Sequence, residues 1–247
     1  MSDQPIDIPW LSADGGAFPD IDTALPEPNG LLAVGGDLSP SRLLDAYQHG
    51  IFPWYEQGQP ILWWSPEPRA VLFPERIHIS RSLRKQLRQD AFTIRFDSAF
   101  DAVIESCSEL TQKREGTWIT TAMKRAYKQM HQLGWAHSIE VWQEERLVGG
   151  LYGLAIGNIF FGESMFSRAP SASKIALVHL CEHLQAEGFV MIDCQVGNDY
   201  LYSMGAEDIG RPMFRRYLND HARPELRKAQ SWESMFWEVV PNKSSSD

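Results

Sequence analysis

Residues 146–166 read RLVGGLYGLAIGNIFFGESMF, and this stretch decides the fold class. Residues 146–156 form a long apolar run, which predicts a buried strand. Gly157-Asn158 is a two-residue hairpin signal, and the apolar run at 159–166 predicts the returning strand. The chain is therefore expected to contain a buried β-hairpin.

Elements on either side of this hairpin extend the sheet. Residues 137–143 alternate between polar and apolar side chains, which predicts a preceding strand. A helix begins at Ser171 or Ser173 and ends before Gly188, and residues 189–195 form another apolar strand. The order strand, strand, strand, helix, strand predicts an α/β (α+β) fold with a mixed sheet. It is the order of an acetyltransferase-like (GNAT-type) core.

The chain is expected to divide into a small loop-rich N-terminal domain over residues 1–66 and an acetyltransferase-like catalytic domain over 67–247. The first part is punctuated by Pro and Gly, and only one helix fits there, with Ser39 as its cap and Gly50 at its end. Elements predicted in the second part, besides those above, are strands at 69–73, 76–79 and 92–96, helices at 80–89, 98–108 and 121–133, and a helix–loop–helix tail.

Composition excludes several classes of protein. Of the 247 residues, 43% are hydrophobic and 22% charged, as in ordinary globular chains, so a disordered, fibrous or repeat protein is not expected. The net charge of −9 gives no bulk attraction to nucleic acid or to anionic membranes. Contact with nucleic acid would need a local basic patch, and no membrane partner is expected.

Cysteine usage and the N-terminal sequence bear on the compartment. Cys107, Cys181 and Cys194 are odd in number and widely spaced, which favours a reducing environment. The first ten residues lack the pattern of a signal peptide. We therefore predict a cytoplasmic protein, and we expect a monomer. The chain also has nine Trp residues, a type that serves either cores or stacking on nucleobases.

One predicted helix carries a local basic patch. Arg81, Arg84, Lys85 and Arg88 share one face of the helix at 80–89, Arg76 precedes them, and no acidic residue lies between 76 and 88. A solvated helix face is the simpler interpretation. Unbalanced positive charge in an acidic chain also favours phosphate binding, so both interpretations stay open.

Three polar residues stand out in the apolar strands. Asp193 and Gln195 share one face at the end of a buried strand, as either a structural hydrogen-bond network or a polar pair at the mouth of a cleft. Glu163 shares a face with Phe161 and Met165 and is expected either to pair with a cation such as Arg168 or to face a cleft. We favour a site.

Other motifs are weaker or missing. His179 to His183 matches H-x-x-E-H, but no third ligand is evident and the match is attributed to coincidence, so no metal is predicted. The chain has no Gly-rich nucleotide loop. The loop at 167–174, where an acetyltransferase would bind pyrophosphate, also lacks Gly, which argues against acetyl-CoA. No cofactor is predicted.

Several longer motifs together resemble the bacterial leucyl/phenylalanyl-tRNA–protein transferase family, over about residues 27–217. The motifs that carry this resemblance are EPNGLLAVGGDLSP (27–40), YQHGIFPW (47–54), ILWWSPEPRAVL (61–72), HISRSLRK (78–85), EGTWIT (115–120), HSIEVW (137–142), LVGGLYG (147–153), FGESMFSR (161–168), ASK (172–174) and IDCQV-x-ND (192–199). The resemblance implies transfer of Leu or Phe from aminoacyl-tRNA to proteins with N-terminal Arg or Lys, which marks them for N-degron degradation. Because an apolar pocket discriminates weakly between similar apolar side chains, Met is expected as a donor too.

The resemblance also implies roles for individual residues. Asp193 and Gln195 match the family's catalytic pair, and Glu163 an assisting carboxylate that would help to bind the positive acceptor. Arg76 and the basic helix would contact the tRNA acceptor stem. Residues expected to bind the donor are Trp54 and Trp118 at the terminal adenosine, Met165, Leu151 and Ser167 around the Leu or Phe side chain, and Tyr47.

Two alternative functions remain to be tested. One is an acetyl-CoA-dependent N-acetyltransferase, against which the Gly-free loop argues. The other is a non-enzymatic RNA-binding adaptor. Such an adaptor would use the basic helix and the tryptophans, but it would have no use for Asp193, Gln195 and Glu163 on cleft-facing strands.

Overall fold

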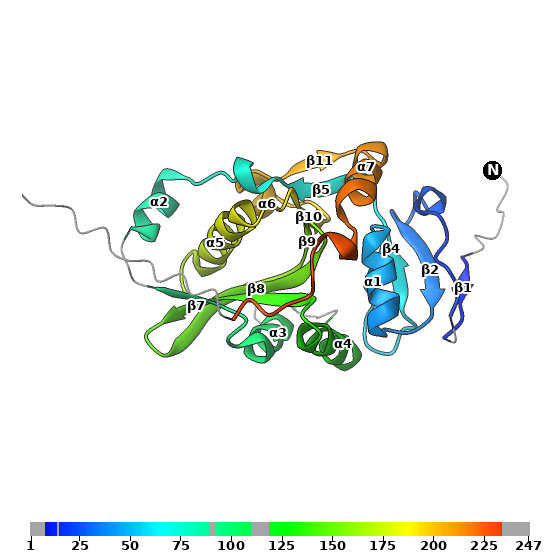
Figure 1. The fold of residues 1–247 in the computed structure, drawn as a ribbon, viewed down its shortest axis with the longest axis horizontal. Coiled ribbons are helices and arrows are strands. Elements are labelled where there is room, and N and C mark those ends of the chain that lie inside the picture. Colours follow the sequence, from blue (N-terminus) through cyan, green and yellow to red (C-terminus); the bar gives the residue numbers. More distant parts are fainter. Residues whose placement is uncertain (1–7, 14, 89–91, 110–118, 234–247) are drawn as a thin grey trace, which may run out of the picture.

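The computed structural model describes residues 8–13, 15–88, 92–109 and 119–233, arranged around two β-sheets (Figure 1). The smaller sheet has the strand order β1 (Trp10–Leu11), β2 (Leu31–Gly35), β4 (Leu62–Trp64) and β3 (Phe52–Pro53). The larger sheet has the order β11 (Glu207–Ile209), β5 (Arg69–Leu72), β10 (Met191–Gln195), β9 (Ile159–Ser167), β8 (Arg146–Ile156), β7 (Ala136–Gln143) and β6 (Thr93–Phe96).

Helices cover both faces of the larger sheet (Figure 1). Helix α5 (Ala172–Ala186) lies on one face, and α3 (Phe100–Ser108) and α4 (Thr121–Gln132) lie on the other. The remaining helices are α1 (Pro40–Gln48), α2 (Arg81–Leu87), α6 (Asp199–Ser203) and α7 (Arg211–His221), with short 3-10 turns η1 (Ile21–Thr23), η2 (Pro74–Arg76) and η3 (Pro224–Leu226). None of the helices in the described ranges is long and apolar enough to cross a membrane.

The predicted hairpin and the mixed sheet are confirmed. Strands β8 and β9 pair antiparallel from Ile156 opposite Ile159, with Gly157-Asn158 as the turn. Gly157 has φ +56°, and a Cβ there would lie 2.1 Å from the carbonyl oxygen of His221, so only glycine fits. Helix α5 then connects β9 to β10, which runs parallel to β9. The predicted order of elements from 137 to 195 is thus the observed one.

Two irregularities open the sheet at one end. The β8–β9 register passes from Gly153 opposite Gly162 to Tyr152 opposite Ser164, so Glu163 is the extra residue of a β-bulge. The parallel β9–β10 pairing ends at Phe161 opposite Asp193. Beyond these points β9 and β10 no longer pair, and side chains from both strands can meet there.

One of the two hydrophobic core clusters of the described residues spans both sheets. Tyr47 on α1 and Trp63 on β4 belong to the same buried cluster as Tyr127 on α4 and Phe161 on β9. The small sheet ends at Trp64 and the large one begins at β5, but the packing is continuous. The division into domains at residue 66 therefore stays a prediction.

The structure corrects three details of the predicted elements. The strand predicted at 76–79 is wrong: η2 ends at Arg76, and the segment after it runs irregularly, with the His78 N–H donating to the carbonyl of Met204. The N-terminal region is less loop-rich than expected, since it contains four short strands. The tail contains the edge strand β11 between its two helices, too short for its alternation to be detected.

Candidate active site

A buried ion pair lies where β5 and β10 run side by side. Arg69 on β5 donates from Nε to Oδ1 of Asp193 (2.8 Å) and from Nη2 to Oδ2 (2.7 Å), a bidentate pair. The side chains are 1% and 0% exposed. The guanidinium of Arg69 lies between the rings of Phe52 and Phe214, at 4.9 and 4.6 Å from their centroids. Asp193 is therefore rigidly held.

Gln195 follows Asp193 in a strained conformation. Its φ is +63°, in the left-handed region that a residue with a Cβ rarely adopts, and the β10–β5 register shifts between Asp193 and Gln195. The backbone N–H of Gln195 donates to Oδ1 of Asp193 (2.9 Å), and its side-chain Nε2 donates to Oε1 of Glu163 (2.9 Å). Asp193 thus holds the backbone of Gln195, and Glu163 holds its amide.

Glu163 is the point where three parts of the chain converge. The hydroxyl of Tyr47 lies 2.7 Å from its Oε1, and the hydroxyl of Tyr127 lies 3.0 Å from its Oε2. Burial raises the pKa of Glu163 to about 8, against the lowering effect of these hydrogen bonds, and the charge of Asp193 adds to the rise. The expected alternative partner, Arg168, instead binds Glu109 at 2.7 Å.

The structure therefore joins Glu163 to Asp193 and Gln195, which the sequence analysis placed on a different strand. It also adds two residues that the sequence analysis missed. Arg69 had a usable signal, a charged side chain in a predicted apolar strand. Tyr127 had none, because its spacing on α4 is that of a core residue. Tyr47 is fully buried behind Glu163 rather than open to solvent.

The expected side-chain pocket residues lie beyond the bulge. Leu151 and Met165 are directly opposite each other on β8 and β9 and pack in the cluster beneath α5. The expectation that Met165 shares a face with Glu163 is wrong, because the bulge reverses the alternation after Glu163. Leu151 is buried and Met165 half-buried, so Met165 is the more accessible of the two.

Of the two tryptophans expected at the adenosine, the structure describes Trp54. Trp54 is 48% exposed, and its ring meets Trp64 edge to face at 5.6 Å. The indole of Trp64 donates to the carbonyl of Trp54 (2.7 Å), which holds the backbone at this point. An exposed indole on an anchored backbone is suited to stacking. Trp118 lies outside the described residues.

The basic face predicted for the helix at 80–89 is present on α2. The four cations are exposed, while Leu83 is buried against the protein. Arg76 does not join this face. It ends η2 and pairs with Glu207 (3.0 Å) and Glu75 (3.7 Å). The cations that remain in one group are Arg81, Arg84, Lys85 and Arg88.

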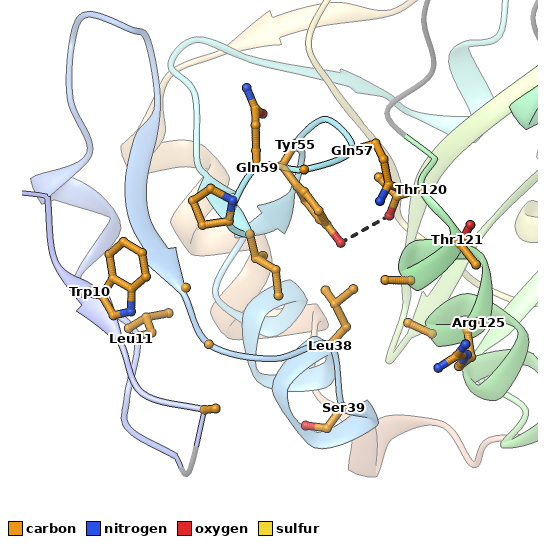
Figure 2. A pocket seen from close by; sticks show the side chains of 18 of the residues that line it. Trp10, Leu11, Leu38, Ser39, Tyr55, Gln57, Gln59, Thr120, Thr121 and Arg125 are labelled. Atoms are coloured by element: carbon orange, nitrogen blue, oxygen red, sulfur yellow. Dashed lines mark hydrogen bonds between the residues drawn. The ribbon is translucent and has the colours of Figure 1, made fainter.

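A groove of about 970 Å³ lies apart from these residues, between the N-terminal sheet and the start of α4 (Figure 2). Tyr55 and Thr120 line it and are joined by a hydrogen bond of 3.3 Å between their hydroxyls. Arg125 on α4 is the cation in its lining. Neither Glu163, Asp193 nor Gln195 lines this groove.

Two hydrogen bonds of Ser167 and close packing on β8 hold the start of α5. Ser167 Oγ accepts from the N–H of Ser173 (3.3 Å) and donates to the carbonyl of Ala169 (2.8 Å). A Cβ on Gly149 would lie 2.5 Å from that of Ala172, so the helix start packs directly on β8. Ser167 lies opposite Gly149, two residues beyond Met165 in an unbroken register, and so shares the face of Met165 and Leu151. Its role at the Leu or Phe side chain stays a prediction.

The H-x-x-E-H motif on α5 is used for packing. His179 pairs with Glu182 (2.9 Å), and the buried ring of His183 lies against Phe96 and Trp232. In the part of the chain that the structure describes, no cluster of three or more His, Cys, Asp and Glu side chains could hold a metal ion.

Comparisons with known proteins place this geometry in a family. A sequence profile described as "Leucyl/phenylalanyl-tRNA protein transferase" matches residues 71–219, and the profile of that family's N-terminal domain matches 36–67. The chain belongs to the leucyl/phenylalanyl-tRNA–protein transferase family. It is therefore an aminoacyltransferase, as the motifs implied.

Proteins named leucyl/phenylalanyl-tRNA–protein transferase align with nearly the whole chain. One from Pseudomonas putida is 55% identical over 227 residues, 92% of this chain and 100% of its own. One from Pseudomonas aeruginosa is 58% identical over 211 residues, 85% and 93%. Among solved structures, a GCN5-related N-acetyltransferase from Kribbella flavida covers 69% of this chain and 61% of its own, at 10% identity and a TM-score of 0.37, too low to decide anything about the site.

Proposed function

We propose that this aminoacyltransferase moves Leu or Phe, and also Met, from aminoacyl-tRNA to the α-amine of proteins that begin with Arg or Lys, and so marks them for N-degron degradation. The observation that carries the proposal is the Asp193–Gln195–Glu163 network at the end of the paired β9–β10 region. The three free cysteines support a cytoplasmic location.

The reaction is aminolysis of an ester. The acceptor α-ammonium has a pKa of about 7.7–8.0, so it must lose a proton before it attacks. Because Nε2 of Gln195 is bound to Glu163, its Oε1 is left to accept a hydrogen bond from the amine. The acceptor nitrogen gives its first proton to solvent water and then forms the new amide bond as the ester oxygen leaves. The neighbouring 2′-hydroxyl relays the second proton from that nitrogen to the leaving oxygen.

Asp193 acts here as a positioning residue and not as a general base. Both its oxygens accept from Arg69, and Oδ1 also accepts from the backbone of Gln195. A carboxylate whose two oxygens both accept from fixed donors is suited to holding the backbone of Gln195 in place. Positioning of an already activated ester then supplies most of the acceleration.

The donor would bind through stacking and apolar contact. Trp54 offers its exposed indole to the terminal adenosine. Met165 and Leu151 offer an apolar surface to the amino-acid side chain. An apolar surface discriminates weakly between side chains of similar size, which is why Leu, Phe and Met are all expected as donors.

The decisive experiment follows labelled Leu from Leu-tRNA to three peptides. We expect acid-stable label on a peptide that begins with Arg, and none on one that begins with Ala or on an N-acetylated Arg peptide. Label on all three would refute the acceptor rule. No transfer with intact tRNA binding would favour the RNA-binding adaptor, and a rise in melting temperature with acetyl-CoA would favour the N-acetyltransferase.

The basic face of α2 makes a separate prediction about tRNA binding. Each phosphate contact steepens the dependence of log Kd on log salt concentration by about 0.7–0.9. We therefore expect the double variant Arg84→Gln, Lys85→Gln to lower that slope by about 1.5 and to weaken binding at low salt. Filter binding at several salt concentrations measures both.

A matched control for this prediction is Arg223→Gln. Arg223 is an exposed cation that pairs with Glu225 at 2.7 Å, away from α2. It should leave the slope unchanged. If the α2 double variant also leaves it unchanged, α2 does not contact the tRNA.

A further inference from the structure

Three oxygen-to-oxygen contacts close a ring at the Glu163 carboxyl. Tyr47 contacts Oε1 at 2.7 Å, Tyr127 contacts Oε2 at 3.0 Å, and the two tyrosine hydroxyls are hydrogen-bonded to each other. A fourth contact brings Nε2 of Gln195 to Oε1 at 2.9 Å with a proton of its own. The ring joins α1, α4 and β9.

The number of protons available to this ring decides whether the Glu163 carboxyl is ionised or neutral. Each of its three contacts needs one proton between two oxygens, and the two tyrosine hydroxyls supply only two. With an ionised carboxylate, both hydroxyls would donate to it, and their mutual contact would bring two lone pairs together. With a neutral carboxyl, a third proton is present and every contact is a hydrogen bond.

We propose that Glu163 is held as a neutral carboxylic acid in a ring of three hydrogen bonds with Tyr47 and Tyr127, and that this ring positions the amide of Gln195. Oε2 donates to Tyr127, Tyr127 donates to Tyr47, and Tyr47 donates to Oε1. Oε1 is then a carbonyl oxygen that accepts from both Tyr47 and Gln195. Glu163, Tyr47 and Tyr127 are positioning residues.

The surroundings favour the neutral form. The negative charge of Asp193 opposes ionisation of Glu163, and the charge of Arg69 is taken up by Asp193. Within the described ranges, no Lys, Arg or His forms an ion pair with Glu163. Burial also raises the pKa of Tyr47 and Tyr127 well above 10, and Tyr152 adds to the rise at Tyr127, so both hydroxyls keep their protons.

The ring has a consequence for the proposed reaction, and to that extent it rests on the proposed function. A neutral Glu163 does not serve as the anion that binds a cationic acceptor. It fixes the orientation of the Gln195 amide, so that Oε1 of Gln195 faces the acceptor amine. Loss of the proton as pH rises through about 8 breaks one contact of the ring and loosens the amide.

The test uses the full chain and the variant Glu163→Gln. Its amide can donate from Nε2 to Tyr127 and accept at Oε1, so it copies the neutral carboxyl but cannot ionise. We expect the ratio of kcat/KM, variant over wild type, to rise several-fold from pH 7 to pH 9. The ratio cancels the deprotonation of the acceptor amine, which both proteins share.

Stability gives a readout that does not depend on activity. The folded-state pKa of about 8 lies above the ordinary value of 4.5, so the wild type loses stability as pH rises from 4.5 to 8. The variant lacks this loss, and its melting temperature should gain on that of the wild type across the same window. In ¹³C NMR, the carboxyl carbon of Glu163 should show a neutral acid at pH 6.

Glu140 provides the matched control. Burial raises the pKa of this carboxyl to about 7, but its oxygens accept from the backbone N–H groups of Ser98 (3.3 Å) and Ala99 (3.4 Å), one on each oxygen. An amide in its place must turn its own N–H₂ toward one of them, so Glu140→Gln should lower the melting temperature at pH 6. Glu163→Gln should not.

Two results would overturn the ring. One is a ¹³C shift of an ionised carboxylate for Glu163 at pH 6. The other is a ratio of kcat/KM that stays flat or falls between pH 7 and pH 9. The NMR result does not depend on activity, so it tests the ring even if the acceptor rule fails because the wild type does not label the Arg peptide.

Discussion

Replacing Asp193 by Asn will lower the free energy of unfolding by about 3–5 kcal/mol, because it leaves the charge of Arg69 buried without a counter-ion. Arg69 is 1% exposed, and its Nη1 already lacks a hydrogen-bond partner within the described structure. The same change should lower kcat by about 10²-fold or more, since Asn keeps one oxygen for the Gln195 N–H but loses the bidentate pair with Arg69 that fixes that oxygen. Urea unfolding and single-turnover transfer measure the two effects.

A double-mutant cycle separates the pair from the rest of the site. Arg69→Met combined with Asp193→Asn removes both charges, so its stability should recover above that of either single variant, while activity stays low. An exposed cluster serves as control: Glu105→Gln, which loses its ion pairs with Lys124 (2.7 Å) and Lys128 (3.2 Å), should cost less than about 1 kcal/mol. If the two single-variant losses at Arg69 and Asp193 simply add, the pair is not coupled.

The second large effect is expected at Gln195. Its φ of +63° costs about 1–2 kcal/mol for a residue with a Cβ, and glycine avoids that cost. Glycine also has a more flexible unfolded chain, which offsets about 0.5–1 kcal/mol. Gln195→Gly should therefore keep or slightly raise the stability while lowering kcat about 10²-fold. The measurements are thermal unfolding and the rate of transfer at saturating Leu-tRNA.

Two further variants separate the loss of the Gln195 amide from the relief of backbone strain. Gln195→Ala also removes the amide but keeps the strain, so it should be less stable than Gln195→Gly and equally slow. Glu144→Gly replaces another left-handed residue (φ +54°), in the exposed turn between β7 and β8, and should not change activity. A fast Gln195→Gly enzyme would show that the amide does not take part.

The sequence by itself determined the local elements and their order. Gly157-Asn158 between two apolar runs specifies a hairpin, because turn chemistry and strand periodicity act over a few residues. The same holds for the basic face of α2, which follows from helical spacing alone. The motifs also led to the right family, since they occur in one order along most of the chain.

Only the tertiary structure decided how the site works. Arg69 and Asp193 are 124 residues apart, and nothing local to either residue names the other as its partner. Tyr127 has the spacing of a core residue, and its hydroxyl gains a role only where α4 meets Glu163. The bulge at Glu163 reversed a face assignment that strict alternation predicts. These features depend on contacts between distant segments and on burial. Such contacts determine hydrogen-bond partners and pKa values, and the periodicity of residues along the chain does not predict them.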